Sequence, residues 1–185
     1  MRSIYILLTR SGTVVSRAIW LVTRADYTHV SLAFDHDLVE MYSSSRKNGR
    51  TLFPSGPTRE YLRGGYFRKP HRIPCALLEL QVDEETYEQV RQEVQAVMRE
   101  QDRYRYNIAG LLMCQMQIPS QRKYHLFCSQ FISMVLQRSN ALDLPRDPSL
   151  MKPNDYASLP GLICRYQGTL SELMAQKQIT NYAIM

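Results

Sequence analysis

The chain has 185 residues, of which 44% are hydrophobic and 22% are charged, and its formal net charge at pH 7 is +6. These values are typical of a soluble globular protein, and the length predicts a single domain over residues 1–185 with a hydrophobic core of its own. No stretch approaches the roughly 18 consecutive apolar residues of a membrane-spanning helix, so no such span is expected.

The N-terminus and the cysteines bear on the cellular compartment. Residues 1–8 carry one positive charge and a short apolar run that is broken before any small-residue cleavage site, so we interpret the run as a strand. The four cysteines are widely spaced and form no CxxC pair, which argues against a zinc knuckle and against a redox dithiol. Without an export signal, disulfides are not expected. We therefore expect a cytoplasmic protein with reduced thiols.

Hydrophobic periodicity and turn residues predict a mixture of strands and helices. In chain order the predicted elements are a strand at 3–9, a short helix at 14–24, strands at 27–34, 38–43 and 76–82, a helix from its N-cap Asp83 to about Gln101, a turn and short helix within 104–113, a helix at about 126–137, a proline-punctuated loop at 144–160, and a strand at 162–170 followed by a frayed helical tail.

The segment between about 44 and 74 is expected to be an irregular loop, because it is rich in Gly, Pro, Ser and Arg and has little periodicity. Its charge is strongly asymmetric, with a single acid, Glu60, among eight basic residues: Arg46, Lys47, Arg50, Arg59, Arg63, Arg68, Lys69 and Arg72. Such a run is either a solvated face or a rim for an anionic substrate or a lipid headgroup. Nucleic acid is the least favoured partner, because aromatic residues are not interleaved in any recognition spacing.

The predicted helix at 126–137 begins with a cysteine. Cys128, Phe131, Ile132, Val135 and Leu136 recur at the spacing of a buried helical stripe. A thiol in the first turn of a helix lies in the field of unpaired N–H groups, which favours the nucleophilic thiolate. The alternative is that Cys128 is a small core hydrophobe.

A cysteine nucleophile needs a base, and four histidines compete for that role. His36 is expected at an exposed turn, His71 lies in the basic segment, and His125 lies on a segment of uncertain conformation. His29 is held in a well-marked strand, where it shares a face with Ser31 and Ala33. If the hairpin turns at residues 36–37, Glu40 on the next strand comes within hydrogen-bonding reach of His29 and can orient it.

These residues carry a resemblance. Tyr-Thr-His29-Val-Ser, Val-Glu40-Met-Tyr and Phe-Cys128-Ser-Gln-Phe together resemble the permuted branch of the NlpC-type papain-like superfamily, which includes YiiX-like proteins and relatives of lecithin:retinol acyltransferase. Tyr104-Arg105-Tyr106 and Lys152-Pro153-Asn154-Asp155-Tyr156 resemble two further motifs of that branch. Phe127 departs from the acidic residue that many relatives carry before the cysteine.

The resemblance implies an α+β, circularly permuted papain-like fold, in which an antiparallel sheet packs against helices and the nucleophile lies at a helix N-terminus. It implies that Cys128 is the nucleophile, His29 the general base and acid, and Glu40 the group that orients His29. The reaction would be attack on an amide or ester carbonyl through an acyl-enzyme. The oxyanion would be held by the Cys128 backbone N–H, with the Tyr104 hydroxyl as a further candidate or merely a packed ring.

Three functional hypotheses stay open at this point. The first is an amidase or peptidase, the second a lipid-directed thioesterase or acyltransferase, and the third a non-catalytic binding module that keeps the fold. The substrate would be a small molecule, a peptide or a lipid, with an anionic substrate or membrane surface meeting the basic segment. No cofactor and no metal are expected, because the chemistry needs none and no metal-ligand spacing is present.

Overall fold

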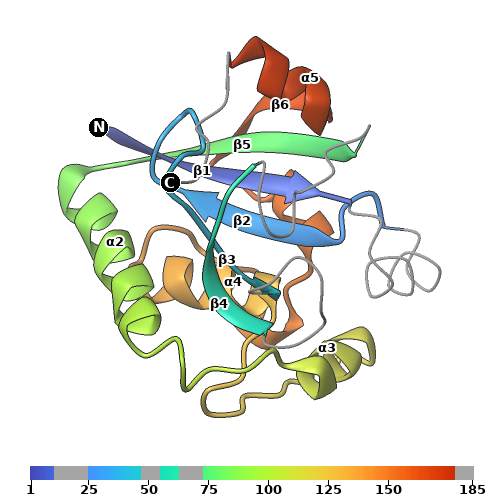
Figure 1. The fold of residues 1–185 in the computed structure, drawn as a ribbon. Coiled ribbons are helices and arrows are strands. Elements are labelled where there is room, and N and C mark those ends of the chain that lie inside the picture. Colours follow the sequence, from blue (N-terminus) through green and yellow to red (C-terminus); the bar gives the residue numbers. More distant parts are fainter. Residues whose placement is uncertain (11–24, 47–54, 63–72, 178–185) are drawn as a thin grey trace.

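The computed structural model describes residues 1–10, 25–46, 55–62 and 73–177. Its architecture is α+β, with a six-stranded antiparallel sheet packed against helices (Figure 1), and this part of the expected fold class is confirmed. The strand order is β4-β3-β2-β1-β5-β6. The strands are β1 (Arg2–Thr9), β2 (His29–Ala33), β3 (Met41–Arg46), β4 (Ser55–Glu60), β5 (Pro74–Val82) and β6 (Leu162–Thr169). The helices are α2 (Glu84–Arg99), α3 (Ile108–Gln115), α4 (Cys128–Arg138) and α5 (Leu170–Gln176), with short 3₁₀ turns at Pro148–Leu150 and Pro153–Ser158.

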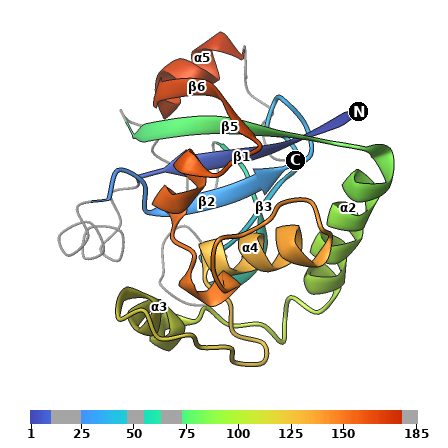
Figure 2. The ribbon, with the colours of Figure 1, turned by 180° about the vertical axis from the view of Figure 1, so that it is seen from behind.

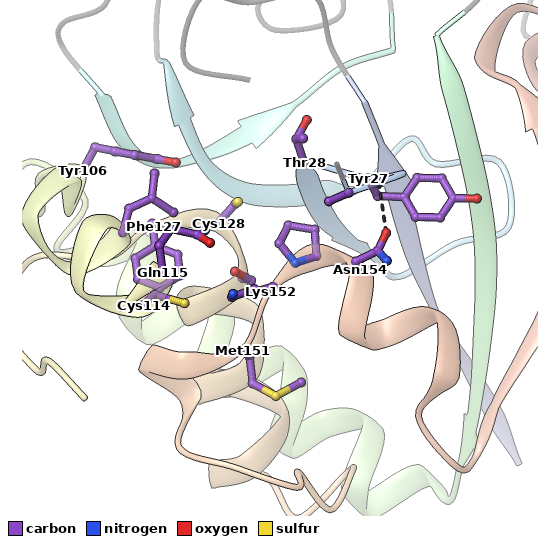
Figure 3. Close-up of a pocket in the computed structure, with 14 residues that line it drawn as sticks. Tyr27, Thr28, Tyr106, Cys114, Gln115, Phe127, Cys128, Met151, Lys152 and Asn154 are labelled. Atoms are coloured by element: carbon purple, nitrogen blue, oxygen red, sulfur yellow. Dashed lines mark hydrogen bonds between the residues drawn. The ribbon is translucent and has the colours of Figure 1, made fainter. Parts of the chain in front are cut away.

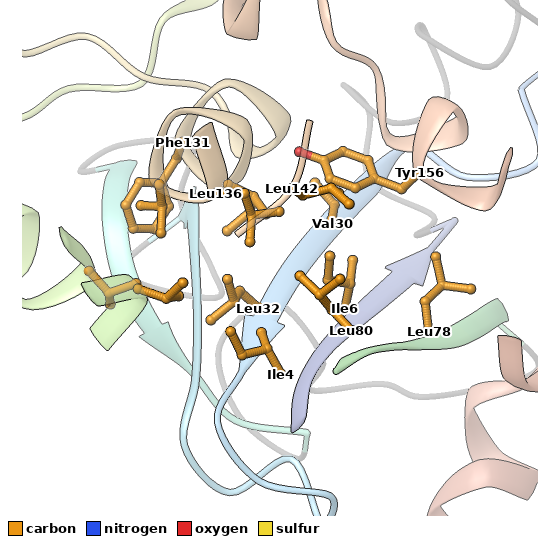
Figure 4. Packing of buried hydrophobic residues seen from close by; sticks show 14 of the residues in the cluster. Ile4, Ile6, Val30, Leu32, Leu78, Leu80, Phe131, Leu136, Leu142 and Tyr156 are labelled. Atoms are coloured by element: carbon orange, nitrogen blue, oxygen red, sulfur yellow. The ribbon is translucent and has the colours of Figure 1, made fainter. Parts of the chain in front are cut away.

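The two faces of the sheet carry separate hydrophobic clusters. On β1, Ile4, Ile6 and Leu8 point to the face covered by α2 and α4, whereas Leu7 points to the face covered by α5. Figure 4 shows Phe131 and Leu136 of α4 lying over the strand residues of the first cluster. Burial on both faces explains why β1 is almost continuously apolar, as is usual for a central strand.

The two long helices follow the predicted periodicity. In α2 the buried residues are Tyr87, Val90, Val94 and Val97, and the Asp83 side chain accepts a hydrogen bond from the Thr86 N–H, as an N-cap does. In α4 the predicted apolar stripe is buried, and Cys128 is the first helical residue. The strands expected at 3–9, 76–82 and 162–170 are also present.

The segment expected to be an irregular loop at 44–74 is partly regular. Strand β3 extends to Arg46, and β4 pairs with it antiparallel along its whole length. Strand β4 contains Gly56 and Pro57 and forms one edge of the sheet, where a proline costs no ladder hydrogen bond. Three expectations fall outside the described residues. They are the short helix at 14–24, the position of His71, and the arrangement of most of the basic residues between 44 and 74.

Within the described ranges, no helix is both long and apolar enough to cross a membrane.

Candidate active site

Cys128 begins α4 and faces a small cavity. Phe127 precedes it in an extended conformation and its side chain makes no capping hydrogen bond, so the N–H groups of the first helical turn are not capped by the preceding side chain. The cavity has a volume of about 40 Å³, and Figure 3 shows the residues around it. The helix start and the cavity together place a sulfur atom beside a set of hydrogen-bond donors.

Four separate segments form the cavity wall. The segment before β2 contributes Tyr27 and Thr28, α3 contributes Leu111, Cys114 and Gln115, and the start of α4 contributes Phe127 to Ser129. Met151 to Asn154 complete the wall, together with Ala25 and Tyr106. Most of these side chains are apolar, so the cavity suits an uncharged group.

His29 lies buried at the start of β2 and contacts both other members of the site. Its Nε2 is 3.1 Å from each carboxylate oxygen of Glu60, and the ring also makes a hydrogen bond with the Cys128 side chain. Burial alone would lower the pKa of His29, but the charge of Glu60 and the hydrogen bonds of the ring to Cys128 and Glu60 raise it to about 10. The ring is therefore an imidazolium at neutral pH.

Glu60 is the carboxylate that holds His29. It is the last residue of β4 and is buried, which alone would raise its pKa, but the charge of His29 and hydrogen bonds from His29 and Ser31 lower it below the ordinary value. Ser31 Oγ donates to Glu60 Oε2 at 2.6 Å. Ser31 shares the strand face of His29, so the histidine, the serine and the carboxylate form one buried polar cluster.

The structure does not bring Glu40 to His29, so the expected partner of the histidine is corrected. Arg91 Nη1 donates to Glu40 Oε1 at 2.8 Å, and the Tyr42 hydroxyl donates to the same oxygen at 3.2 Å. The cause is the turn before β3. The Asp35 carboxylate accepts from the backbone N–H groups of Val39 and Glu40, and the Phe34 N–H donates to the Glu40 carbonyl, so Glu40 lies opposite Phe34.

The other two histidines in the described ranges, His36 and His125, have contacts elsewhere. His36 is exposed at the hairpin turn, as expected, with Nδ1 at 3.2 Å from Asp37 Oδ1. His125 Nδ1 donates to the Lys123 carbonyl at 2.8 Å and faces partly into solvent.

Of the two tyrosines near residue 105, the cavity is lined by Tyr106 and not by Tyr104. The ring of Tyr104 packs edge-on against Tyr124, with 5.2 Å between centroids. Tyr104 is therefore a packed ring, which is the second of the two interpretations, and its hydroxyl is not an oxyanion donor in this cavity.

The segment at residues 152–156 holds the far wall of the cavity in place. Asn154 Oδ1 accepts from the Tyr27 backbone N–H at 3.1 Å, the contact drawn dashed in Figure 3. The Tyr156 hydroxyl donates to the Ser129 carbonyl at 3.1 Å and lies 2.6 Å from Ser133 Oγ, so it ties the segment to the first turns of α4.

Among the described residues, no group of three or more His, Cys, Asp or Glu side chains is arranged to hold a metal ion. The described cysteines are all free thiols.

Comparison with known proteins gives a likeness at the level of fold. No family model matches the chain, and no curated protein matches its sequence. Among solved structures, the chain is similar to the one described as the crystal structure of metalloprotein yiiX from Escherichia coli O157:H7, DUF1105. The TM-score is 0.58 and the identity 14%, with 90% of this chain and 97% of that chain covered. The expected YiiX-like fold is thus supported, while the roles of individual residues are not addressed by this likeness.

Proposed function

We propose that this protein is a cysteine-dependent hydrolase or acyltransferase with a permuted papain-like arrangement, in which a histidine strand precedes a cysteine helix. Cys128 is the nucleophile, His29 is the general acid and base, and Glu60 is the positioning residue that orients His29. The observation that carries this proposal is the buried chain of contacts from Cys128 through His29 to Glu60, at a helix N-terminus beside a cavity.

The charge state of His29 fits such a reaction. Because its pKa is raised to about 10, the ring carries a proton at neutral pH, and an imidazolium beside a sulfur favours the thiolate. The thiolate then attacks a carbonyl carbon, forming an S–C bond while the carbonyl electron pair moves to oxygen. The backbone N–H groups at the start of α4 are placed to stabilise that oxyanion.

The proton on His29 is then used to release the leaving group. His29 transfers it to the leaving nitrogen or oxygen as the bond from carbon breaks, which leaves an acyl-thioester on Cys128. A water molecule or another acceptor then attacks the thioester, His29 takes the proton of the acceptor, and the thiolate leaves. Glu60 keeps the imidazole in one orientation throughout both steps.

The substrate is an amide in the first version of this proposal and an acyl ester or thioester in the second. The cavity, about 40 Å³ in volume with a largely apolar wall, would hold a small uncharged group next to the reacting carbonyl in either version. The basic residues between 46 and 72 would meet an anionic part of either substrate or an anionic surface.

The pH profile of cysteine alkylation tests the nucleophile. The four cysteines are labelled with iodoacetamide between pH 6 and 8 and separated by peptide mass spectrometry. Exposed Cys164 is the internal control. The alkylation rate of an unactivated thiol rises about tenfold per pH unit below a pKa of about 8.5. Under the proposal the rate at Cys128 should change less than that at Cys164, because the His29 imidazolium favours the thiolate. The shape of the profile is the readout, so that restricted access to a buried sulfur does not affect the interpretation.

A His29→Asn variant should return the Cys128 profile to the steep form of Cys164. A wild-type profile for Cys128 that is as steep as that of Cys164 would contradict the proposal and favour a binding module.

A further inference from the structure

Helix α3 has an apolar face on its outer side. Ile108, Leu112 and Met116 follow one another at intervals of four residues and are 50%, 63% and 69% exposed. Met113 and Ile118 are also exposed and extend this face. Figures 1 and 2 show α3 at the end of the molecule opposite α5, apart from the sheet. We refer to these five side chains as the α3 face.

The α3 face is unusual for a surface in water. Five large apolar side chains lie within eleven consecutive residues, and α3 itself contains no charged residue to interrupt them. Single exposed apolar residues are ordinary, but a contiguous apolar patch marks a contact surface. Another side of the same helix faces the cavity, where Leu111, Cys114 and Gln115 form part of the wall.

The chain segment that contains α3 carries no acidic side chain, although Asp147, beside the neighbouring 3₁₀ turn, accepts a hydrogen bond from Gln121. From Arg103 to Leu142 the sequence contains no aspartate and no glutamate. Exposed Arg105 precedes α3, exposed Arg122 and Lys123 follow it, and isolated bridges of Arg105 and Arg122 with His125 bring these flanking segments together. A second copy of this chain would bring like charges together across such a face, whereas an anionic surface would complement them.

We propose that the α3 face docks on a membrane surface that contains anionic lipids. The apolar side chains enter the boundary between headgroups and acyl chains, and Arg105, Arg122 and Lys123 meet the headgroup phosphates. The cavity lies on the other side of α3, so docking brings it within about one helix diameter, roughly 10 Å, of the lipid. That the cavity then receives a lipid acyl group rests on the proposed function, but docking itself does not.

Vesicle flotation with the full chain tests docking without any need for activity. The vesicles are pure phosphatidylcholine or phosphatidylcholine with 30% phosphatidylglycerol, at low and at high salt. Wild-type protein should float with the anionic vesicles and should lose binding as salt rises. Cys128→Ser should float like wild type, which separates failure of docking from failure of the proposed chemistry.

Two sets of variants probe the α3 face. Leu112→Gln with Met116→Gln keeps side-chain size and helix propensity and should reduce the partition coefficient at least tenfold. Arg122→Gln with Lys123→Gln should reduce binding to anionic vesicles about fivefold per cation and should weaken the salt dependence. Val39→Gln is the matched control, because Val39 is as exposed as Ile108 but lies far from α3 in sequence, and its binding should be unchanged.

Three results would overturn the proposal. The first is wild-type protein that does not float with anionic vesicles at low salt. The second is equal binding by wild type and by the Leu112→Gln, Met116→Gln variant. The third is a wild-type protein that is a dimer in light scattering, a Leu112→Gln, Met116→Gln variant that is a monomer, and no vesicle binding by either protein. The α3 face would then be covered by a second copy of the chain.

Discussion

Glu40 and Glu60 each pair with a different cation. Glu40 is partly exposed and meets Arg91, whose guanidinium also stacks over the Phe34 ring at 4.4 Å. Glu60 is buried and pairs with His29, and the two side chains are only 2% and 5% exposed. A buried charge is tolerated only with a close partner and satisfied hydrogen bonds, and Ser31 supplies one of those bonds. The His29–Glu60 pair therefore depends on both members, whereas the Glu40–Arg91 pair is a surface contact.

Replacing Glu60 by glutamine should slow alkylation of Cys128 at pH 6 by at least about tenfold, because the neutral amide no longer holds the imidazolium. Glu40→Gln is the control and should leave the alkylation rate within about twofold of wild type. Rates are measured by quenched iodoacetamide labelling on protein whose fold is checked by circular dichroism. Equal effects of the two substitutions would remove Glu60 from the site.

Among single residues, the sequence allows Cys128 and His29 to be chosen as candidate site residues, but it does not identify the carboxylate that contacts His29. Both are marked by a regular element, since one begins an apolar helical stripe and the other lies in an alternating strand. A two-residue turn at 36–37 would itself place Glu40 opposite Ala33, and the observed turn places it opposite Phe34, so neither register brings the carboxylate to His29. The signal that the sequence offers for Glu60 is its isolation as the single acid in a strongly basic segment.

The element that links the cavity to the surface is α3, and its start is held by a buried asparagine. Asn107 Oδ1 accepts from the Gly110 N–H at 3.0 Å, and Asn107 Nδ2 donates to Gln130 Oε1 of α4 at 3.1 Å. A β-carbon at Gly110 would lie 2.1 Å from Asn107 Nδ2, which is too close for any real contact. The glycine is therefore required by packing, so that one side chain can cap α3 and connect it to α4.

Gly110→Ala should destabilise the protein by about 1–3 kcal/mol, although the same change in an open helix stabilises by about 1 kcal/mol. The reason is that Asn107 must leave its cap and its contact with Gln130. Urea unfolding followed by circular dichroism measures the change. Ala109→Gly at the exposed neighbouring position reports the propensity effect alone, about 1 kcal/mol of destabilisation. A gain in stability for Gly110→Ala would refute the proposed role of the glycine.

Periodic elements are the ones that the sequence predicts well. Helices α2 and α4 show a 3.6-residue apolar repeat because each covers one face of the sheet. Strand β4 shows no alternation, because it is an edge strand with Gly56 and Pro57, and the Tyr106 N–H donates to its Ser55 carbonyl. Helix α3 is apolar on both sides, one facing the cavity and one exposed, so its pattern could not fix its limits.

The stability of the whole molecule is linked to pH through the site. His29 has a folded pKa of about 10 against an ordinary value of 6.5, so its contribution is fully present below pH 6.5 and is lost as pH rises towards 10. Glu60 has a lowered pKa, so its contribution is present above about pH 4.5 and is lost in acid.

Cys128→Ser removes the thiol from the site but keeps Glu60, which raises the pKa of His29. The unfolding free energy of the variant should therefore fall between pH 6.5 and 8.5 by up to about 1.4 kcal/mol per pH unit, the limit for one proton. Urea titrations at pH 6.5, 7.5 and 8.5 give the slope, and an unfolding free energy that does not fall over this range would contradict the raised pKa of His29.

The order of the site residues along the chain has a consequence for biosynthesis. His29 begins the inner strand β2 and Glu60 ends the edge strand β4, whereas Cys128 follows about 100 residues after His29. At about 5–20 residues per second, a ribosome makes the histidine roughly 5–20 s before the thiol. Under the proposed function, a nascent or prematurely terminated chain that ends between Glu60 and Cys128 carries the imidazole and its carboxylate but not the nucleophile. Such a product could not form an acyl-thioester at this site.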